Sequence, residues 1–249
     1  MQNNINLKFK QLDYALVTGA AQRIGKNIAI YLAKQGWNII LHYNKSKNKA
    51  LELQQYILHY IGRDCILYQE NFGKLNNLQF FTKELSVGLI INNAAIFEID
   101  TLNNLTEDDL INTLKINFST PLLLIRSILN STSYNKQINI INILDVMIYQ
   151  LPRNFTSYYF SKYMLANLTK LLAKVYAPRV RVNGIALGQI LKNDRQKTSK
   201  FNHESINNPL NHKVGIKEIH STINFIITNQ SVTGQIISLD GGTHLCINK

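Results

Sequence analysis

The chain alternates short apolar runs with longer segments in which apolar residues recur at helical spacing. The short runs are bounded by glycine or polar residues and predict buried strands over 14–18, 37–43, 65–69, 87–93, 138–144, 180–187 and 235–239. The helical spacing predicts helices over 23–35, 47–61, 75–85, 106–130, 158–176 and 214–228. Thr106 is the predicted N-cap of the fourth helix, and Pro121 is expected to bend it. Residues 188–213 are polar and are predicted to be irregular.

Strands that are apolar throughout and alternate with helices are typical of a parallel sheet covered on both faces. We therefore expect an α/β fold of the Rossmann type, a doubly wound seven-stranded parallel sheet with helices on both faces. Nothing in the pattern divides the chain, so residues 1–249 are predicted to form a single domain, with 1–12 as an N-terminal extension. Ligands of such sheets bind beyond the carboxyl ends of the strands. The residues that follow the strands are therefore the candidates for chemistry.

The composition narrows the function classes. A net charge of +12 is compatible with a solvated basic surface or with attraction of anions such as a phosphorylated cofactor. The sequence shows no nucleic-acid-binding motif, no CxxC pair and no histidine spacing typical of a metal site, so neither nucleic acid nor a metal is expected. It also has no apolar run of bilayer length and no apolar signal core in "MQNNINLKFKQ". A soluble cytoplasmic protein without a membrane partner is the expectation.

Two segments after the first two strands point to a dinucleotide. "TGAAQRIG" (18–25) joins a strand to a helix through a glycine-bounded turn, where backbone amides can approach a pyrophosphate. "LHYNKS" (41–46) ends the second strand, where an acidic residue would bind the ribose diol of NAD. Asn44, Lys45 and Ser46 instead offer donors and a positive charge, which favours the 2′-phosphate of NADP. A plain structural turn and an ordinary solvated loop are the alternative interpretations.

Six motifs in order resemble the short-chain dehydrogenase/reductase family over nearly the whole chain after the first dozen residues. They are "TGAAQRIG", "NNAA" (92–95), Asn117 within a helix, Tyr158 and Lys162 as YxxxK, "VNGIALG" (182–188) and "TGQIISLDGG" (233–242). YxxxK alone is a weak pattern, but the ordered set is specific. The resemblance implies the Rossmann-type fold, a nicotinamide cofactor and oxidoreductase activity.

Departures from the family pattern narrow the resemblance to the pteridine reductases and dihydromonapterin reductases. Arg23 replaces a usual glycine and Asp145 replaces a usual serine. "LHYNKS" resembles the HYxRS of those enzymes, Phe97 falls where they have a pterin-stacking phenylalanine, and "VTGQIISLDGGTHL" resembles their ending. Two further departures are Leu187 in place of a proline and Asn71 in place of an aspartate that holds the adenine end.

The resemblance implies a role for each matched residue. Asn117, Asp145, Tyr158 and Lys162 are the implied catalytic set, with Asn117 holding a water that links Lys162 to solvent. The substrate is expected to contact Arg23, Phe97, Asp145 and Tyr158, under a substrate loop formed by 188–213. NADP(H) is expected to contact Gly19, Gln22, Arg23, Ile24, Gly25, His42, Tyr43, Asn44, Lys45, Ser46, Asn71, Phe72, Asn93, Ala94, Ala95, Lys162, Leu187 and Gly188. Family members are commonly homotetramers, and the apolar stretches "PLLLI" and "MLANLTKLLA" suit such pairing.

The chemistry of these side chains gives independent support. Lys162 lies one helical turn from Tyr158, so its charge is expected to lower the pKa of the phenol. A serine at position 145 would donate to a carbonyl oxygen, whereas Asp145 can accept from Tyr158, hold a water or pass a proton to a ring nitrogen. Asp145 is thus interpreted as a switch from C=O to C=N substrates. Simple turn capping by Asp145 and core packing by Phe97 are the plainer alternatives.

We therefore predict an NADPH-dependent reductase of a dihydropterin, namely dihydromonapterin, dihydrobiopterin or dihydrofolate. The alternative is an NADPH-dependent carbonyl reductase, such as a 3-oxoacyl thioester reductase. A third hypothesis is a non-catalytic scaffold or nucleic-acid-binding member that uses its basic surface. Arg23 and Asp145 disfavour the second, and the intact Asn117, Tyr158 and Lys162 disfavour the third.

Overall fold

The computed structural model describes residues 13–74, 85–150, 152–192 and 198–246. The expected extension over 1–12 and all but the last residue of the expected helix over 75–85 lie outside these ranges.

The centre of the molecule is one parallel sheet of seven strands in the order β3-β2-β1-β4-β5-β6-β7. Each strand coincides with an apolar run of the sequence, within a residue or two at its ends. The strands are β1 (Tyr14–Val17), β2 (Asn38–Tyr43), β3 (Cys65–Gln69), β4 (Val87–Asn92), β5 (Ile138–Asp145), β6 (Val180–Leu187) and β7 (Ile236–Leu239). The predicted doubly wound fold is confirmed.

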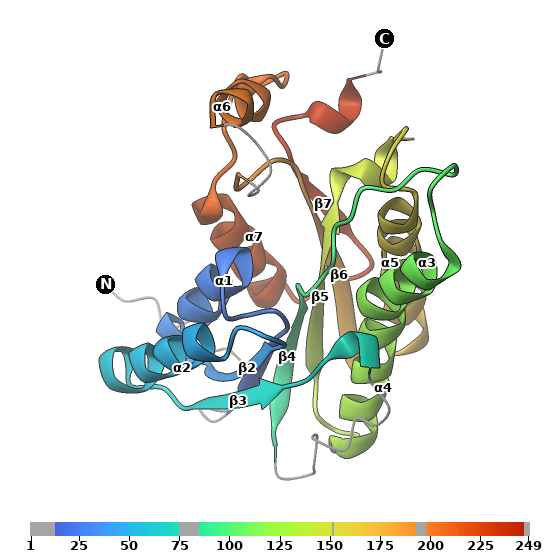
Figure 1. The fold of residues 1–249 in the computed structure, drawn as a ribbon. Helices are drawn as coiled ribbons and strands as arrows, with labels where there is room; N and C mark the ends of the chain where they lie inside the picture. The colour runs from blue at the N-terminus through green and yellow to red at the C-terminus, as the bar shows by residue number, and fades with distance from the viewer. Residues whose placement is uncertain (1–12, 75–84, 151, 193–197, 247–249) are drawn as a thin grey trace.

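Helices cover both faces of this sheet (Figure 1). One face carries α1 (Arg23–Lys34), α2 (Lys47–Tyr56) with a π turn (Ile57–Ile61), and α7 (Ile216–Thr228). The other face carries α3 (Glu107–Leu114), α4 (Thr120–Ser131) and α5 (Thr156–Val175). The short helix α6 (Thr198–Ile206) lies beyond one end of the sheet.

Alternation along the strands divides the core into two layers. In β2, Ile39 and Leu41 pack among the residues of one apolar cluster, whereas Ile40 between them packs in the other. All three side chains are fully buried. Each such burial stabilises the fold by roughly 1.5–3 kcal/mol, so both helical layers are held firmly against the sheet that positions the site.

The helix predicted over 106–130 is confirmed, because the chain is helical from Glu107 to Ser131, but it contains a π turn that was not predicted. The side chain of Thr106 caps α3 as predicted, accepting a hydrogen bond from the Asp109 amide at 3.1 Å. However, α3 ends at Leu114 and a π turn over Lys115–Ser119 precedes α4. Pro121 lies in the first turn of α4, where a missing N–H is tolerated. The irregularity is therefore the π turn, which carries Asn117, and not a bend at Pro121.

The segment 188–213 is also less irregular than predicted, because it contains α6. Phe201 and Ser205 on this helix are buried, and the ammonium group of Lys213 lies 4.7 Å from the centre of the Phe201 ring. Two buried positions one turn apart were too weak a periodic signal to predict a helix in so polar a stretch. Residues 193–197 of this segment lie outside the described ranges.

Candidate active site

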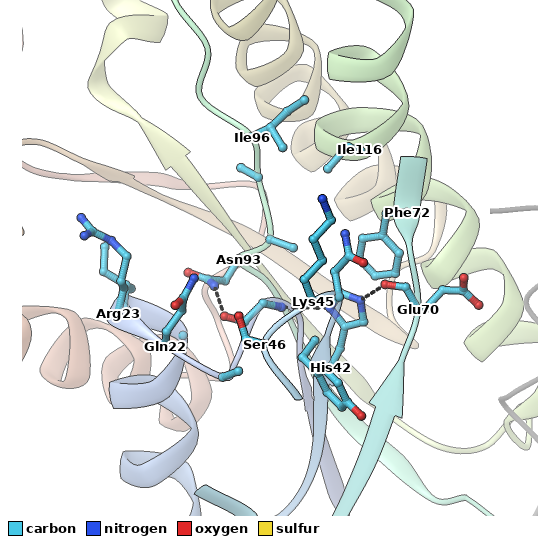
Figure 2. A pocket seen from close by; sticks show the side chains of 18 residues that line it. Gln22, Arg23, His42, Lys45, Ser46, Glu70, Phe72, Asn93, Ile96 and Ile116 are labelled. Atoms are coloured by element: carbon cyan, nitrogen blue, oxygen red, sulfur yellow. Dashed lines mark hydrogen bonds between the residues drawn. The ribbon is translucent and has the colours of Figure 1, made fainter. Parts of the chain in front are cut away.

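A cavity of about 430 Å³ lies where the strand order reverses (Figure 2). β1 and β4 are neighbours in the sheet although β2 and β3 separate them in the chain. The connections from these two strands leave in opposite directions, which opens a crevice at their carboxyl ends. The turn after β1, the end of β2 and the end of β4 all contribute to its lining.

The turn after β1 is built for close backbone approach. Gly19 has a φ of +63°, and a Cβ there would lie 3.1 Å from the Cα of Ala94. A Cβ on Gly25 would lie 2.3 Å from the carbonyl oxygen of Gly19, so only glycine fits. The side-chain amide of Asn93 donates to the carbonyl of Thr18 at 2.8 Å and clamps the turn to the end of β4. This cradle suits a ligand that approaches the backbone itself.

His42 lies in the wall of this cavity as a neutral side chain that joins two backbone segments by hydrogen bonds. Burial lowers its pKa to about 4. Its Nδ1 accepts a hydrogen bond from the Gly19 amide at 3.0 Å, so Nε2 carries the proton and donates to the Glu70 carbonyl at 3.1 Å. The ring stacks on Phe72, with centres 3.9 Å apart and planes 1° apart. His42 therefore lines the cavity as predicted, while its hydrogen-bonding groups are used within the protein.

Both helices that begin at this cavity lack a side-chain cap in the described structure. Gln22 precedes α1 and Ser46 precedes α2, and neither side chain accepts from its helix. The Lys47 amide donates to the Lys45 carbonyl at 3.0 Å, and other backbone N–H groups of the two first turns are available to bind an anion. Lys45 lines the same end of the cavity, and its side chain rises through the centre of Figure 2. The combination of free amides and a lysine fits the phosphates of NADP.

Sequence reasoning missed two residues at this end. Lys49 donates to the side-chain oxygen of Gln22 at 3.0 Å, which brings a second ammonium group to the start of α1 and α2. Its place in the first turn of the helix predicted over 47–61, which begins directly after Lys45 and Ser46, was a signal that could have found it. Glu70 also lines the cavity and holds the Asn71 amide at 2.9 Å. No motif marked Glu70 in advance.

Most of the residues predicted to contact NADP(H) line this cavity. They are Gly19, Gln22, Arg23, Ile24, Gly25, His42, Tyr43, Asn44, Lys45, Ser46, Phe72, Asn93, Ala94 and Ala95. Gly188 lines a second cavity instead, and Asn71, Lys162 and Leu187 line neither of the two. The side-chain oxygen of Asn71 accepts from the Gly73 amide at 3.0 Å within its own turn. Its contact with the adenine end of the cofactor stays a prediction.

The second cavity, of about 410 Å³, adjoins the first through Arg23 and Ile24, which line both. All four residues predicted to contact the substrate, Arg23, Phe97, Asp145 and Tyr158, line this second cavity. They come from the turn after β1, the loop after β4, the end of β5 and α5. The fold thus gathers at one place residues that are far apart in the sequence.

Asp145 and Tyr158 form a hydrogen-bonded pair, in which Tyr158 is buried and Asp145 is half-buried. The phenol Oη of Tyr158 donates to Oδ2 of Asp145 at 3.0 Å, and the Met147 amide donates to Oδ1 at 2.9 Å. Asp145 therefore caps the turn after β5 and also accepts a hydrogen bond from the tyrosine. Its interpretation as a switch between substrates stays a prediction. Burial raises the pKa of Asp145, opposed by its hydrogen bonds and by the charge of Lys162. A raised pKa makes it easier for the Asp145 carboxylate to take up a proton.

The predicted effect of Lys162 on Tyr158 is wrong in this structure. Burial and the adjacent Asp145 raise the pKa of Tyr158 well above its ordinary value. The Nζ of Lys162 lies 5.7 Å from the centre of the Tyr158 ring and donates to the carbonyl of Ile143 at 2.8 Å. Burial lowers the pKa of Lys162 to about 8. The spacing in the sequence correctly places the two residues on one helix face. It does not reveal how deeply Tyr158 is buried, and burial is the largest cause of its raised pKa.

The side chain of Asn117 joins the loop after β4 to α5, and its expected role in holding a water stays a prediction. Its Oδ1 accepts from the Ile96 amide at 2.9 Å, and its Nδ2 donates to the Ile96 carbonyl and the Ser161 hydroxyl, each at 3.0 Å. The π turn brings this buried amide between the loop after β4 and α5. Asn117 therefore positions the two segments that carry Phe97 and Tyr158.

Arg23 occupies an unusual backbone conformation. Its φ is +54°, in the left-handed region where a side chain is disfavoured and where the family has glycine. Its guanidinium donates to the Lys192 carbonyl at 2.9 Å, which joins the turn after β1 to the segment after β6. Figure 2 shows Arg23 at one end of the first cavity, opposite Glu70. A strained residue at the junction of two cavities indicates a functional constraint.

Phe97 presents an aromatic face at the second cavity. Its ring stacks on Phe155 with centres 4.4 Å apart and meets the edge of Tyr158 at 4.7 Å. The side chain is nevertheless 41% exposed, so its packing leaves a surface open to the cavity. Packing and ligand contact are therefore compatible at this position.

Within the described residues, no group of His, Cys, Asp and Glu side chains is placed to hold a metal ion. No helix in the described ranges combines the length and apolarity needed to cross a membrane.

Comparison with known proteins identifies the family of this chain. The crystal structure of the FolM alternative dihydrofolate reductase 1 from Brucella suis, in complex with NADP, superposes with a TM-score of 0.91 at 30% identity and covers 97% of this chain and 98% of that chain. A dihydromonapterin reductase from Shigella boydii is 28% identical over 239 residues, 92% of this chain and 96% of the relative. A 3-oxoacyl acyl-carrier-protein reductase from Staphylococcus epidermidis is 26% identical over 245 residues, 93% of this chain and 98% of the relative. The short chain dehydrogenase family model matches residues 13–203, and this protein therefore belongs to that family of oxidoreductases.

Proposed function

We propose that this oxidoreductase uses NADPH to reduce a dihydropterin to its tetrahydro form, with dihydromonapterin, dihydrobiopterin and dihydrofolate as candidate substrates. The observation that carries the proposal is the 3.0 Å hydrogen bond from Tyr158 Oη to Asp145 Oδ2 in the wall of the second cavity. A carbonyl substrate needs a donor at its oxygen, and an ionised carboxylate offers only acceptors. A dihydropterin ring carries N–H groups that suit such an acceptor.

The cofactor assignment is supported by the first cavity. The glycine-bounded turn and the uncapped starts of α1 and α2 offer backbone donors for phosphate oxygens. Lys45 and Lys49 bring positive charge to the same end, which suits a 2′-phosphate. The Brucella suis relative was crystallised with NADP. When bound, NADPH supplies the hydride.

Arg23 and Phe97 support a flat substrate. Both line the second cavity, and Phe97 offers an aromatic ring on which a planar heterocycle can stack. Arg23 also lines the first cavity, so its guanidinium is close to both ligands. Holding the pterin between these groups and the nicotinamide end orients the acceptor carbon, which is the main task of such a site.

Tyr158, Asp145 and Lys162 handle the proton that the ring nitrogen must gain. Tyr158 retains its proton because burial and Asp145 raise the pKa of the phenol. Asp145, whose pKa burial also raises, accepts from that phenol and can pass the proton on to the ring nitrogen. Tyr158 is then left as a phenolate, and water returns its proton before the next turnover. Lys162, buried behind the ring, opposes the negative charge that develops when the phenol gives up its proton.

The proposed assembly is a homotetramer paired through the helices that carry the catalytic residues. Large apolar side chains on α4 and α5 remain exposed in the single chain, among them Leu123 at 40%, Phe160 at 50%, Leu171 at 56% and Val175 at 60%. An apolar surface of this kind is typical of an oligomer interface. Sedimentation of the purified protein tests this assembly. A cytoplasmic location stays a prediction of the sequence.

The function is tested by following the loss of NADPH absorbance when each of the three dihydropterins is added to the purified protein. Turnover that disappears in Tyr158→Phe and Asp145→Ala is the expected result. An acetoacetyl thioester tests the alternative, which the relative from Staphylococcus epidermidis favours. Turnover of the thioester with none of the dihydropterins would reject the proposal and leave the family and fold unchanged.

A further inference from the structure

We infer that Asp100 is a positioning residue that fixes the start of α5, and with it Tyr158, relative to Phe97. Asp100 lies in the loop after β4, far in sequence from α5, and its side chain is buried. The inference rests on the proposed function only for the identity of the substrate. It applies to any reaction of this site in which Tyr158 handles the proton.

The Asp100 carboxylate binds the first turn of α5 through Ser157. The Ser157 amide donates to Oδ1 at 3.2 Å and to Oδ2 at 3.3 Å, and the Ser157 hydroxyl donates to Oδ2. The backbone of Asp100 adds a third link, because its carbonyl accepts from the Phe155 amide at 2.7 Å. Asp100 thus accepts hydrogen bonds from the amide and the hydroxyl of Ser157 and from the amide of Phe155.

α5 needs this external cap because its own sequence supplies none. Phe155 stands at the N-cap position with a φ of +68° and has no side chain that could accept a hydrogen bond. The first turn of this 20-residue helix also contains no acidic residue. A buried carboxylate at this end binds the free amides and complements the positive end of the helix dipole. Asp100 supplies from a distant loop what a capping aspartate normally supplies locally.

The same loop carries the aromatic wall of the second cavity. Its backbone is fixed at Ile96 by the side chain of Asn117 and at Asp100 by α5. Phe97 lies between these two anchors and contacts Phe155 and Tyr158 through its ring. The distance from the stacking face of Phe97 to the phenol of Tyr158 is therefore set by the Asp100 anchor. Catalysis is sensitive to displacements of about 1 Å in such arrangements.

The test compares the loss of two helix caps, the cap that Asp100 gives to α5 and the cap that Thr106 gives to α3. Asp100→Ala removes the cap of α5, which carries Tyr158 and Lys162. Thr106→Ala removes the hydroxyl that caps α3 by accepting from the Asp109 amide at 3.1 Å. No residue of α3 lines either cavity. Asp100→Asn keeps an acceptor for the Ser157 amide and serves as the conservative variant. NADPH binding, kcat and KM, and hydrogen exchange of residues 155–162 are measured for each.

The expected result is that Asp100→Ala lowers kcat with a dihydropterin by about tenfold or more and raises KM, with NADPH affinity unchanged. Hydrogen exchange at the start of α5 should rise in the same variant, and Asp100→Asn should recover part of both effects. Thr106→Ala should change kcat by less than about twofold, although it too loses a cap.

The inference is overturned if Asp100→Ala leaves the exchange of residues 155–162 unchanged. It is also overturned if Asp100→Ala and Thr106→Ala lower kcat equally, because a general loss of stability would then explain both. If the unmodified protein reduces no dihydropterin, the proposed function fails, but the hydrogen-exchange comparison still decides the role of Asp100.

Discussion

The phenol of Tyr158 donates its hydrogen bond to Asp145 across 3.0 Å, so the candidate proton donor is paired with a carboxylate and not with a hydroxyl. The arrangement keeps the phenol protonated, because burial and the carboxylate both raise the pKa of Tyr158. It also leaves Asp145, fixed by the Met147 amide, at the surface of the second cavity. A raised pKa makes the phenol a weaker acid, so in the proposed reaction it gives up its proton only to a ring nitrogen that becomes strongly basic as the hydride arrives.

Replacing Asp145 by serine is expected to lower dihydropterin turnover by about 100-fold, the scale of a lost acid–base partner. NADPH affinity should stay unchanged, because Asp145 lines only the second cavity. The measurement is steady-state turnover of Asp145→Ser, of Tyr158→Phe and of the double variant. Since the two residues act as one unit, the double variant should be little slower than the slower single variant. Full dihydropterin turnover by Asp145→Ser would reject the role given to the carboxylate.

Replacing Arg23 by glycine is expected to stabilise the fold while weakening activity. The left-handed backbone of Arg23, at a φ of +54°, carries strain of about 1–2 kcal/mol that glycine does not have. Glycine loses about 0.5–1 kcal/mol through its freer unfolded state, so a net gain of about 0.5 kcal/mol is expected. The guanidinium that lines both cavities is lost, and kcat/KM for the dihydropterin should fall by about tenfold.

Denaturant unfolding of wild type, Arg23→Gly and Arg23→Lys measures this trade-off. Arg23→Lys keeps the Cβ and the strain, and should match the stability of the wild type. A clearly destabilised Arg23→Gly would mean that the side-chain contacts of Arg23, such as its hydrogen bond to the Lys192 carbonyl, outweigh the strain.

The strands of the sheet could be predicted well from the sequence because most of them are buried on both faces and therefore form continuous apolar runs. The run 180–187 is buried at every position except Arg181, which is half-buried, and β6 spans the predicted residues. The glycine-bounded turn followed from its motif, and the hydrogen bond from Tyr158 is one of the three roles considered for Asp145. Parallel strands bring their carboxyl ends to one edge of the sheet. The four predicted substrate residues accordingly line one cavity.

The remaining features depend on contacts that no local pattern encodes. The pKa of Tyr158 is decided by burial, so the spacing to Lys162 predicted the wrong direction. The cap that Asp100 gives to Ser157 joins residues 57 positions apart. The π turn that carries Asn117 has the same apolar periodicity as a plain helix, and α6 is too polar to be distinguished from a loop.

Lys49 is expected to contribute to the choice of NADPH over NADH. Lys49→Gln removes the ammonium group that Gln22 holds at the start of α1, and should weaken NADPH binding by about fivefold, or about 1 kcal/mol. NADH binding should not change, because it lacks the 2′-phosphate. Fluorescence titration with both nucleotides measures the effect, and Lys34→Gln at the other end of α1 is the control for charge alone. Equal loss of affinity for both nucleotides would assign Lys49 to the pyrophosphate or to the fold instead.

His42 is expected to make the fold sensitive to mild acid. Its pKa is lowered by burial from 6.5 to about 4 in the folded protein. Between these values the unfolded chain binds more protons than the folded chain, so the free energy of unfolding falls as the pH falls through this window. The full difference amounts to about 3 kcal/mol, and it is absent above the unfolded pKa.

Denaturant unfolding of the wild type and of His42→Asn at pH values from 7 to 4 measures how much of the pH dependence of stability comes from His42. The asparagine side chain can still accept from the Gly19 amide but does not titrate, so the variant should start less stable at pH 7 and lose less stability toward pH 4. The two curves should converge as the pH falls. Parallel curves would show that His42 takes up a proton in the folded state as readily as in the unfolded chain, and that the link between Gly19 and Glu70 survives with a charged ring.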